Sequence, residues 1–232
     1  MAVSFLGSNQ QTSTGSSVGV SVTVPAGGGY LEVYVTTGGA TTQFSGVADN
    51  SGNGNLYTIQ SSAEDTVGTQ SLARYTSNAS VAAGTFTVTA SFANSTQGAL
   101  GIAVILVTGS TGQLAGLAAN FQTTPGTGVG AVTTGSSGTL SSQPSVMVAI
   151  TIGSSGGTLS TSAAGGSTQL GSTIWGALKA NLGFMETQAL SATTSIAATF
   201  TAGSATNNFI SVGGIWQQSS GAAPPLMGQI LT

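Results

Sequence analysis

Apolar and polar residues alternate with a period of two along much of the chain. In residues 18–24, valine occupies every even position, glycine, serine and threonine occupy the odd ones, and Pro25 follows. Successive side chains of a strand point to opposite faces, so this pattern predicts a half-buried β-strand with hydroxyl groups on its outer face. The same alternation recurs in residues 31–36, 86–92, 146–152 and 196–200.

Residues 100–107 are apolar at nearly every position. A strand that is apolar on both faces is typical of a position between two packed layers. No window combines a convincing helical period with caps, and residues 114–121 are the best candidate for a short turn of helix.

Glycine and asparagine cluster between the expected strands. Both residues adopt positive φ at low cost, as tight hairpin turns require. Many short strands joined by such turns predict an all-β fold, which we expect to be a jelly-roll-like, antiparallel two-sheet β-sandwich with little or no helix. The glycine-rich turns are residues 27–29, 38–39, 52–55, 156–157 and 165–166.

The two halves of the chain share a spacing. Phe92 is followed ten residues later by Ile102 in an apolar strand, and Phe200 is followed ten residues later by Ile210 in another. A long alternating strand precedes each pair. This spacing is consistent with a duplicated unit, and also with the recurring hairpins of a single sandwich.

We therefore predict a β-sandwich domain over residues 1–216. The alternative within it is two related halves, residues 1–122 and 144–216, joined by a Gly/Thr/Ser-rich connection at 123–143. Residues 217–232 contain two adjacent prolines followed by apolar residues, and we expect them to form an extended C-terminal arm.

Charged residues are unusually scarce. They make up 3% of the chain, against roughly a quarter in an average soluble domain, and histidine and cysteine are absent. Most catalytic acids, bases, nucleophiles and metal ligands belong to these types, so we expect no enzyme activity, no cofactor and no metal site. Two basic residues cannot form a basic patch, which argues against nucleic acid and anionic membranes. The charged residues are Glu32, Asp49, Glu64, Asp65, Arg74, Lys179 and Glu186.

The N-terminal residues have no basic stretch, and their apolar run is too short for a signal peptide. The longest apolar run, residues 100–107, is well below the roughly 20 residues that span a bilayer. We therefore expect synthesis in the cytoplasm without an export signal, although the Thr/Ser-rich composition resembles that of extracellular or particle-surface proteins.

Residues 49–55 superficially resemble a calcium-binding loop. Calcium requires several oxygen ligands with substantial negative charge, but Asp49 is the only charged residue here, and the position eleven residues on is Gln60. A hairpin turn in which Asx side chains bond the local backbone is the favoured interpretation.

Two further candidates for catalysis are weak. Glu64 and Asp65 are adjacent, so on a strand they point to opposite faces and do not converge as the carboxylates of a glycosidase must. A Ser–Lys dyad has only Lys179 available, and alternation places this lysine on an exposed face beside Trp175.

A carbohydrate site is the strongest of the binding hypotheses. Such sites combine aromatic rings with amide groups, and the aromatic candidates are Tyr34, Tyr57, Tyr75, Trp175 and Trp216. Of these, Tyr57, Tyr75 and Trp175 are the preferred glycan contacts. Aromatic residues are only 6% of the chain, however, and the competing interpretation is that these rings fill the core.

Several short segments together resemble a β-sandwich module of phage virion proteins that also occurs in bacterial surface proteins. The segment 47–58, with Asp49-Asn50 and a later glycine, asparagine and tyrosine, resembles the module's Asp-Asn-x-Gly-Asn-x-Tyr turn with two extra residues. The other matching segments are residues 3–5, 20–27, 31–35, 82–89 and 102–109.

This resemblance implies a virion structural protein without catalytic residues. The expected role is a capsid decoration or cement protein that binds the lattice through shape, backbone and apolar contacts. Its expected partners are further copies of itself, as a dimer or trimer, and a major capsid protein. It would be made in the host cytoplasm and act in the virion. The expected assembly arm comprises Pro224, Pro225, Leu226, Met227, Ile230 and Leu231.

Two alternatives stay open. One is a tail or head fibre, or an adhesion module, that binds host-surface glycan. The other is a subunit of an extracellular filament, which would place the protein outside the cell or at the cell surface.

Overall fold

The computed structural model describes residues 2–12, 15–38, 43–65, 70–93, 99–124, 130–140, 146–153, 159–161, 168–171, 182–189, 195, 197–202 and 207–218. Within these residues the chain forms sixteen β-strands and no α-helix. Every strand pair in the sheets is antiparallel. The prediction of an all-β antiparallel sandwich is confirmed.

The first eight strands form a jelly roll. One sheet has the order β1-β8-β3-β6-β5 and the other has the order β2-β7-β4. Strands β1 to β4 therefore alternate between the two sheets, as they do in jelly rolls built from two Greek keys. The bounds are β1 (Ala2–Gln11), β2 (Ser17–Val24), β3 (Tyr30–Thr37), β4 (Phe44–Asp49), β5 (Tyr57–Asp65), β6 (Gln70–Ser77), β7 (Gly84–Phe92) and β8 (Leu100–Thr108).

The next eight strands repeat this topology. One sheet has the order β13-β14-β11-β16-β9 and the other has the order β10-β15-β12. Adding eight to each strand number of the first jelly roll gives the strand order of the second. The bounds are β9 (Ser110–Thr124), β10 (Gly130–Thr133), β11 (Val146–Gly153), β12 (Leu159–Thr161), β13 (Thr168–Gly171), β14 (Leu182–Ala189), β15 (Thr199–Ala202) and β16 (Asn207–Gln218).

The division between the two jelly rolls falls at Gly109, which has a φ of 66°. The connection expected at residues 123–143 instead contains the end of β9 and all of β10, so the two halves meet earlier than the composition suggests. The spacing seen in the sequence falls on equivalent strands, because Phe92 and Phe200 lie in β7 and β15, and the isoleucine of each pair lies in β8 and β16.

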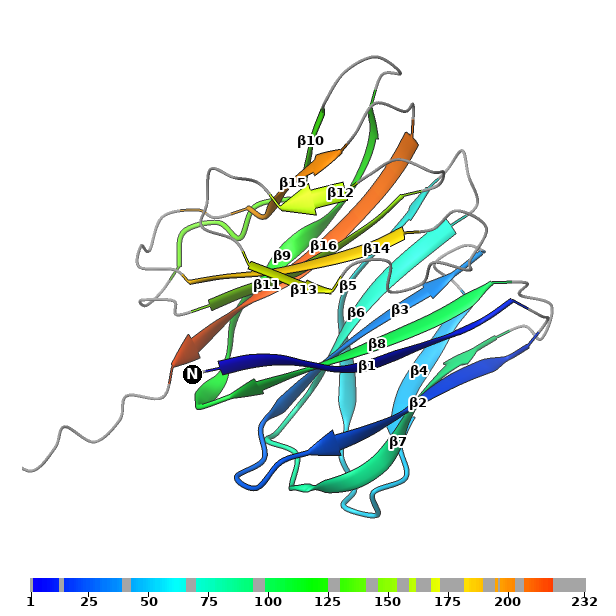
Figure 1. Ribbon diagram of the computed structural model, residues 1–232, viewed down its shortest axis with the longest axis vertical. Helices are drawn as coiled ribbons and strands as arrows, with labels where there is room; N and C mark the ends of the chain where they lie inside the picture. Colours follow the sequence, from blue (N-terminus) through cyan, green and yellow to red (C-terminus); the bar gives the residue numbers. More distant parts are fainter. Residues whose placement is uncertain are drawn as a thin grey trace, which may run out of the picture.

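The four sheets stack as successive layers, with the two five-stranded sheets in the middle (Figure 1). The first core lies between β2-β7-β4 and the sheet of β3 and β8. A second core lies between the two central sheets, where Ile105 and Val107 of β8 pack with Val148, Ile150 and Val212 of the second jelly roll. A third core lies between the sheet of β11 and β16 and the sheet β10-β15-β12.

Strand β8 shows why residues 100–107 are apolar throughout. Leu100, Ile102 and Val104 belong to the first core, while Ala103 and Ile105 belong to the second. The prediction of a strand between two layers is confirmed.

The prediction that residues 31–36 are only half-buried is wrong. Glu32, Tyr34 and Thr36 are each at most 1% exposed, although they alternate with the apolar residues of β3. The second jelly roll covers the face that the alternation pattern assigns to solvent, so polar residues there are enclosed between the central sheets.

Residues 114–121, the best candidate for a short turn of helix, are instead part of strand β9. The register between β9 and β16 shifts at three places, and at each of them β9 contributes one extra residue. Each such bulge turns the following side chains to the opposite face. Bulges therefore produce the irregular spacing of apolar residues that resembles a helical period.

Candidate functional site

The loop between β4 and β5 is held by the carboxylate of Asp49. This carboxylate accepts hydrogen bonds from the backbone N of Ser51 at 2.9 Å, from Asn55 Nδ2 at 2.9 Å and from the Tyr57 hydroxyl at 2.7 Å. Gly52 and Gly54 have φ values of 77° and 66°, the left-handed region that glycine adopts without strain. The arrangement agrees with the prediction of a turn organised by Asx side chains.

The pKa of Asp49 is below its usual value. Partial burial acts to raise this pKa, but the hydrogen bonds from Ser51, Tyr57 and Asn55 together have a larger, opposite effect and lower it. Since the unfolded pKa is about 3.9, the ionised carboxylate stabilises the fold above about pH 4, and this stabilisation is lost as pH falls through the folded pKa.

We therefore expect Asp49→Asn to lower the free energy of unfolding at neutral pH and to have a smaller effect in acid. Urea unfolding of the wild type and the variant between pH 2.5 and pH 7 measures the difference. A gap that stays constant across this range would show that the charge of Asp49 does not contribute.

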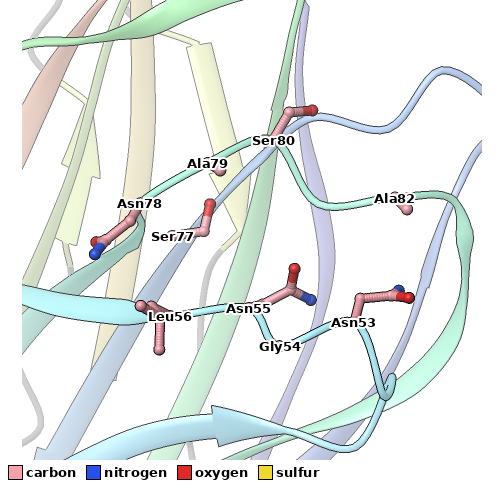
Figure 2. A pocket seen from close by; sticks show the side chains of 9 residues that line it. All are labelled: Asn53, Gly54, Asn55, Leu56, Ser77, Asn78, Ala79, Ser80 and Ala82. Atoms are coloured by element: carbon pink, nitrogen blue, oxygen red, sulfur yellow. The ribbon is translucent and has the colours of Figure 1, made fainter.

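One hollow lies beside this loop, and a second lies next to the first. The first has a volume of about 390 Å³ and lies between the β4–β5 loop and the segment that follows β6 (Figure 2). The second also has a volume of about 390 Å³ and lies where the two jelly rolls meet. Ser77 and Asn78 line both hollows, so the two adjoin, and we call them together the polar groove.

The lining of the polar groove is uncharged. Both jelly rolls contribute to the second hollow, with Tyr30 and Gln60 from the first, and Gln113 and Trp216 from the second. The first hollow is lined by Asn53, Gly54, Asn55, Leu56, Ser77, Asn78, Ala79, Ser80 and Ala82. The second is lined by Tyr30, Gln60, Thr76, Ser77, Asn78, Thr111, Gly112, Gln113 and Trp216.

A buried network connects with the second hollow through Gln113 and Trp216. Glu32 and Arg74, both 0% exposed, form an ion pair between the central sheets. Glu32 also accepts hydrogen bonds at 2.5 Å from Trp216 Nε1 and from the Tyr34 hydroxyl. Arg74 Nη2 donates to Gln113 Oε1 at 3.1 Å. The Glu32–Arg74 ion pair of the first jelly roll is thus hydrogen-bonded to Gln113 and Trp216 of the second.

The pKa values in this network shift as burial and charge require. Burial and the neighbouring Glu32 carboxylate raise the pKa of Tyr34 well above its usual value, so its hydroxyl stays protonated and donates to Glu32. Burial acts to lower the pKa of Arg74, but attraction to Glu32 and Tyr34 and the hydrogen bonds with them together outweigh it, so this pKa is raised. Tyr34 therefore stays neutral and Arg74 stays charged at ordinary pH.

Each candidate glycan contact has a separate outcome. Tyr75 is 5% exposed and packs in the first core, as the competing interpretation expects, so its ring offers little surface to a glycan. Tyr57 packs partly against the same core and its hydroxyl binds Asp49, so it does not line the groove. Trp175 lies outside the described residues. The arm residues Pro224, Pro225, Leu226, Met227, Ile230 and Leu231 also lie outside them.

The remaining four charged residues are described to different extents. Glu64 lies half-buried on β5, Asp65 and Glu186 lie at described backbone positions in β5 and β14, and Lys179 lies outside the described residues. Among the described side chains, no group of three acidic residues is placed to hold a metal ion. In the same residues, no helix has the length and hydropathy needed to cross a membrane.

Of the aromatic candidates named from the sequence, Trp216 lines the second hollow, but sequence reasoning did not find the rest of the groove. Tyr30, Gln60, Asn78 and Gln113 come from different strands and loops, and none of them belongs to a recognisable motif. Comparisons of the chain with protein-family models, curated proteins and solved structures found no match.

Proposed function

We propose that this chain is a bacteriophage virion structural protein of the capsid decoration or cement type, with no enzyme activity. Support comes from the doubled jelly roll, because jelly rolls are common in viral capsid proteins. Because one fold can serve many functions, the surface of the protein must also suit this role.

The observation that carries the proposal is the outer face of sheet β2-β7-β4. Its side chains on β2 and β7 are short and uncharged, and we call this set the hydroxyl face. Thr23 and Thr85 on adjacent strands share a hydrogen bond of 3.0 Å between their Oγ1 atoms. The hydroxyl face comprises Ser17, Ser21, Thr23, Thr85, Thr87, Thr89 and Ser91.

Such a face suits binding to a repeated protein lattice. Short hydroxyl side chains allow close approach of a partner, and they lose little conformational freedom when they are covered. Without charges, the contact depends on shape and hydrogen bonds, so salt screens it little. The proposed partners are a major capsid protein and further copies of this chain.

We expect antibodies against the purified protein to label particles released by the cells that carry its gene, in a regular array seen by electron microscopy. The label should persist after the particles are washed in 1 M NaCl, because ionic contacts contribute little. Labelling of particle tails alone would instead favour the fibre alternative, and labelling of filaments would favour the filament.

A pair of variants tests the hydroxyl face. Thr89→Arg places a long charged side chain at the centre of the face and should strongly reduce incorporation into particles. Ser62→Arg adds the same side chain at an exposed position on β5 and should be incorporated normally. Equal incorporation of both variants would show that the hydroxyl face does not contact the lattice.

A further inference from the structure

We propose that the polar groove binds a neutral carbohydrate, with Gln60, Asn78 and Gln113 as hydrogen-bonding residues. Each hollow is within the usual range of small-molecule sites, about 300–1,000 Å³. The second hollow lies at the junction of the two jelly rolls, and ligand sites often occur between such units. The groove uses different elements from the hydroxyl face, so this proposal is independent of the assembly role.

The side-chain amides of Gln60, Asn78 and Gln113 around the second hollow each use one of their two polar atoms in a hydrogen bond within the protein. Arg74 has only donors, so Gln113 must present Oε1 to it and keep its Nε2 donor for another partner. Gln60 Nε2 donates to the carbonyl of Thr58 at 3.3 Å, which leaves Gln60 Oε1 as an acceptor. Asn78 Oδ1 accepts from the Thr58 hydroxyl at 2.7 Å, which leaves Nδ2 as a donor.

The first hollow repeats this arrangement with Asn55. Its Nδ2 donates to the Asp49 carboxylate at 2.9 Å and to Ser51 Oγ at 3.1 Å, so its Oδ1 is left as an acceptor. Figure 2 shows the Asn55 amide beside the first hollow and the Asn78 side chain extending away from it, over the start of β5. The groove thus presents donors and acceptors along its length.

The walls of the groove are also fixed. The Tyr30 and Trp216 rings lie 5.3 Å apart at an angle of 46°, and the Tyr30 hydroxyl donates to the carbonyl of Thr111 at 3.2 Å. Ser110 Oγ donates to the carbonyl of Gln217 at 2.7 Å, which joins the start of β9 to the end of β16. A site that is formed before binding loses less entropy when its ligand arrives.

The chemistry of the lining selects a neutral, hydroxyl-rich ligand. A phosphate or carboxylate needs a cation, but Arg74 is buried and already paired with Glu32. An apolar ligand would leave the amide groups without partners. A sugar hydroxyl both donates and accepts, so it matches the alternating amide ends, and the half-buried Tyr30 ring offers apolar surface to a sugar face.

A glycan array with neutral and acidic glycans, probed with the labelled full-length protein, tests the proposal. We expect binding to neutral glycans, and titration calorimetry with the best of them should show about tenfold weaker binding for Gln60→Ala and for Asn78→Ala. Both side chains are exposed, so these variants should keep the wild-type melting temperature. Thr87→Ala on the hydroxyl face is the matched control and should bind normally.

Three results would overturn the proposal: no binding to any neutral glycan, a preference for acidic glycans, or full affinity in both groove variants. Incorporation into particles, measured on the same variants, separates the two roles. The groove variants should assemble like the wild type, whichever way the glycan experiment ends.

Discussion

Replacing Arg74 by methionine should lower the free energy of unfolding by about 3–5 kcal/mol, the largest effect that we expect from a single substitution. Methionine fills similar space but leaves the Glu32 carboxylate buried without its opposite charge. The hydrogen bonds from Tyr34 and Trp216 to Glu32 stay available, but they are neutral donors and only partly compensate. Urea unfolding of the full chain at neutral pH measures the loss.

The double variant Glu32→Gln/Arg74→Met provides the control. It removes both charges, so it should be more stable than Arg74→Met alone, because no isolated charge is buried. Removing one partner of an exposed ion pair lowers the free energy of unfolding by less than about 1 kcal/mol. A loss this small in Arg74→Met would contradict the buried position of this pair.

The second large effect is expected for Gly214→Ala in β16. A Cβ at this position would lie 2.0 Å from Arg74 Nη2 and 2.3 Å from its Cζ. An arginine at the surface would move aside, but this guanidinium is held by Glu32 and Gln113. We expect a loss of about 3 kcal/mol, at the upper end of the usual cost of overpacking.

Gly116→Ala is the matched control for this substitution. Gly116 is the partner of Gly214 in the register between β9 and β16, and its added Cβ would approach only Gln113 Nε2, at 3.6 Å. It should therefore unfold within about 1 kcal/mol of the wild type. Equal losses in the two alanine variants would show that a general effect of glycine replacement, rather than contact with Arg74, is responsible.

The strands that could be predicted from the sequence are those whose pattern is local. Valine at each even position of residues 18–24 predicts a strand with one buried face, and these residues form β2. The continuous apolar run of residues 100–107 predicts a strand with two buried faces, and these residues form β8. Each of these patterns depends only on whether the residues of that segment are buried, so the strand can be predicted without knowing which distant segments pack against it.

The junction of the two jelly rolls could not be predicted in this way. Glu32 stands in an alternating strand, where a charged residue ordinarily marks the solvent side. Its burial depends on Arg74 and Trp216, which lie 42 and 184 residues further along the chain. Nothing in the local pattern of any of these segments encodes the pairing.

The polar groove was missed for a related reason. The aromatic residues selected from the sequence were judged by type, and Tyr75 proved to be a core residue. The groove instead depends on amide side chains whose free ends are set by their anchors, as Gln113 is by Arg74. Amide residues are common on surfaces, so their sequence positions alone carry no signal.

The placement of Glu32 and Arg74 also has a consequence for the nascent chain. The first jelly roll is complete once Thr108 has been synthesised, but the face of β3 and β8 that carries Tyr34 and Ile105 is covered by β11 and β16, which are synthesised later. During this interval Glu32 and Arg74 would be hydrated, and their charges would interrupt an apolar surface that is otherwise prone to aggregation. We therefore expect Glu32 and Arg74, which are enclosed in the finished protein, to reduce aggregation of the incomplete chain.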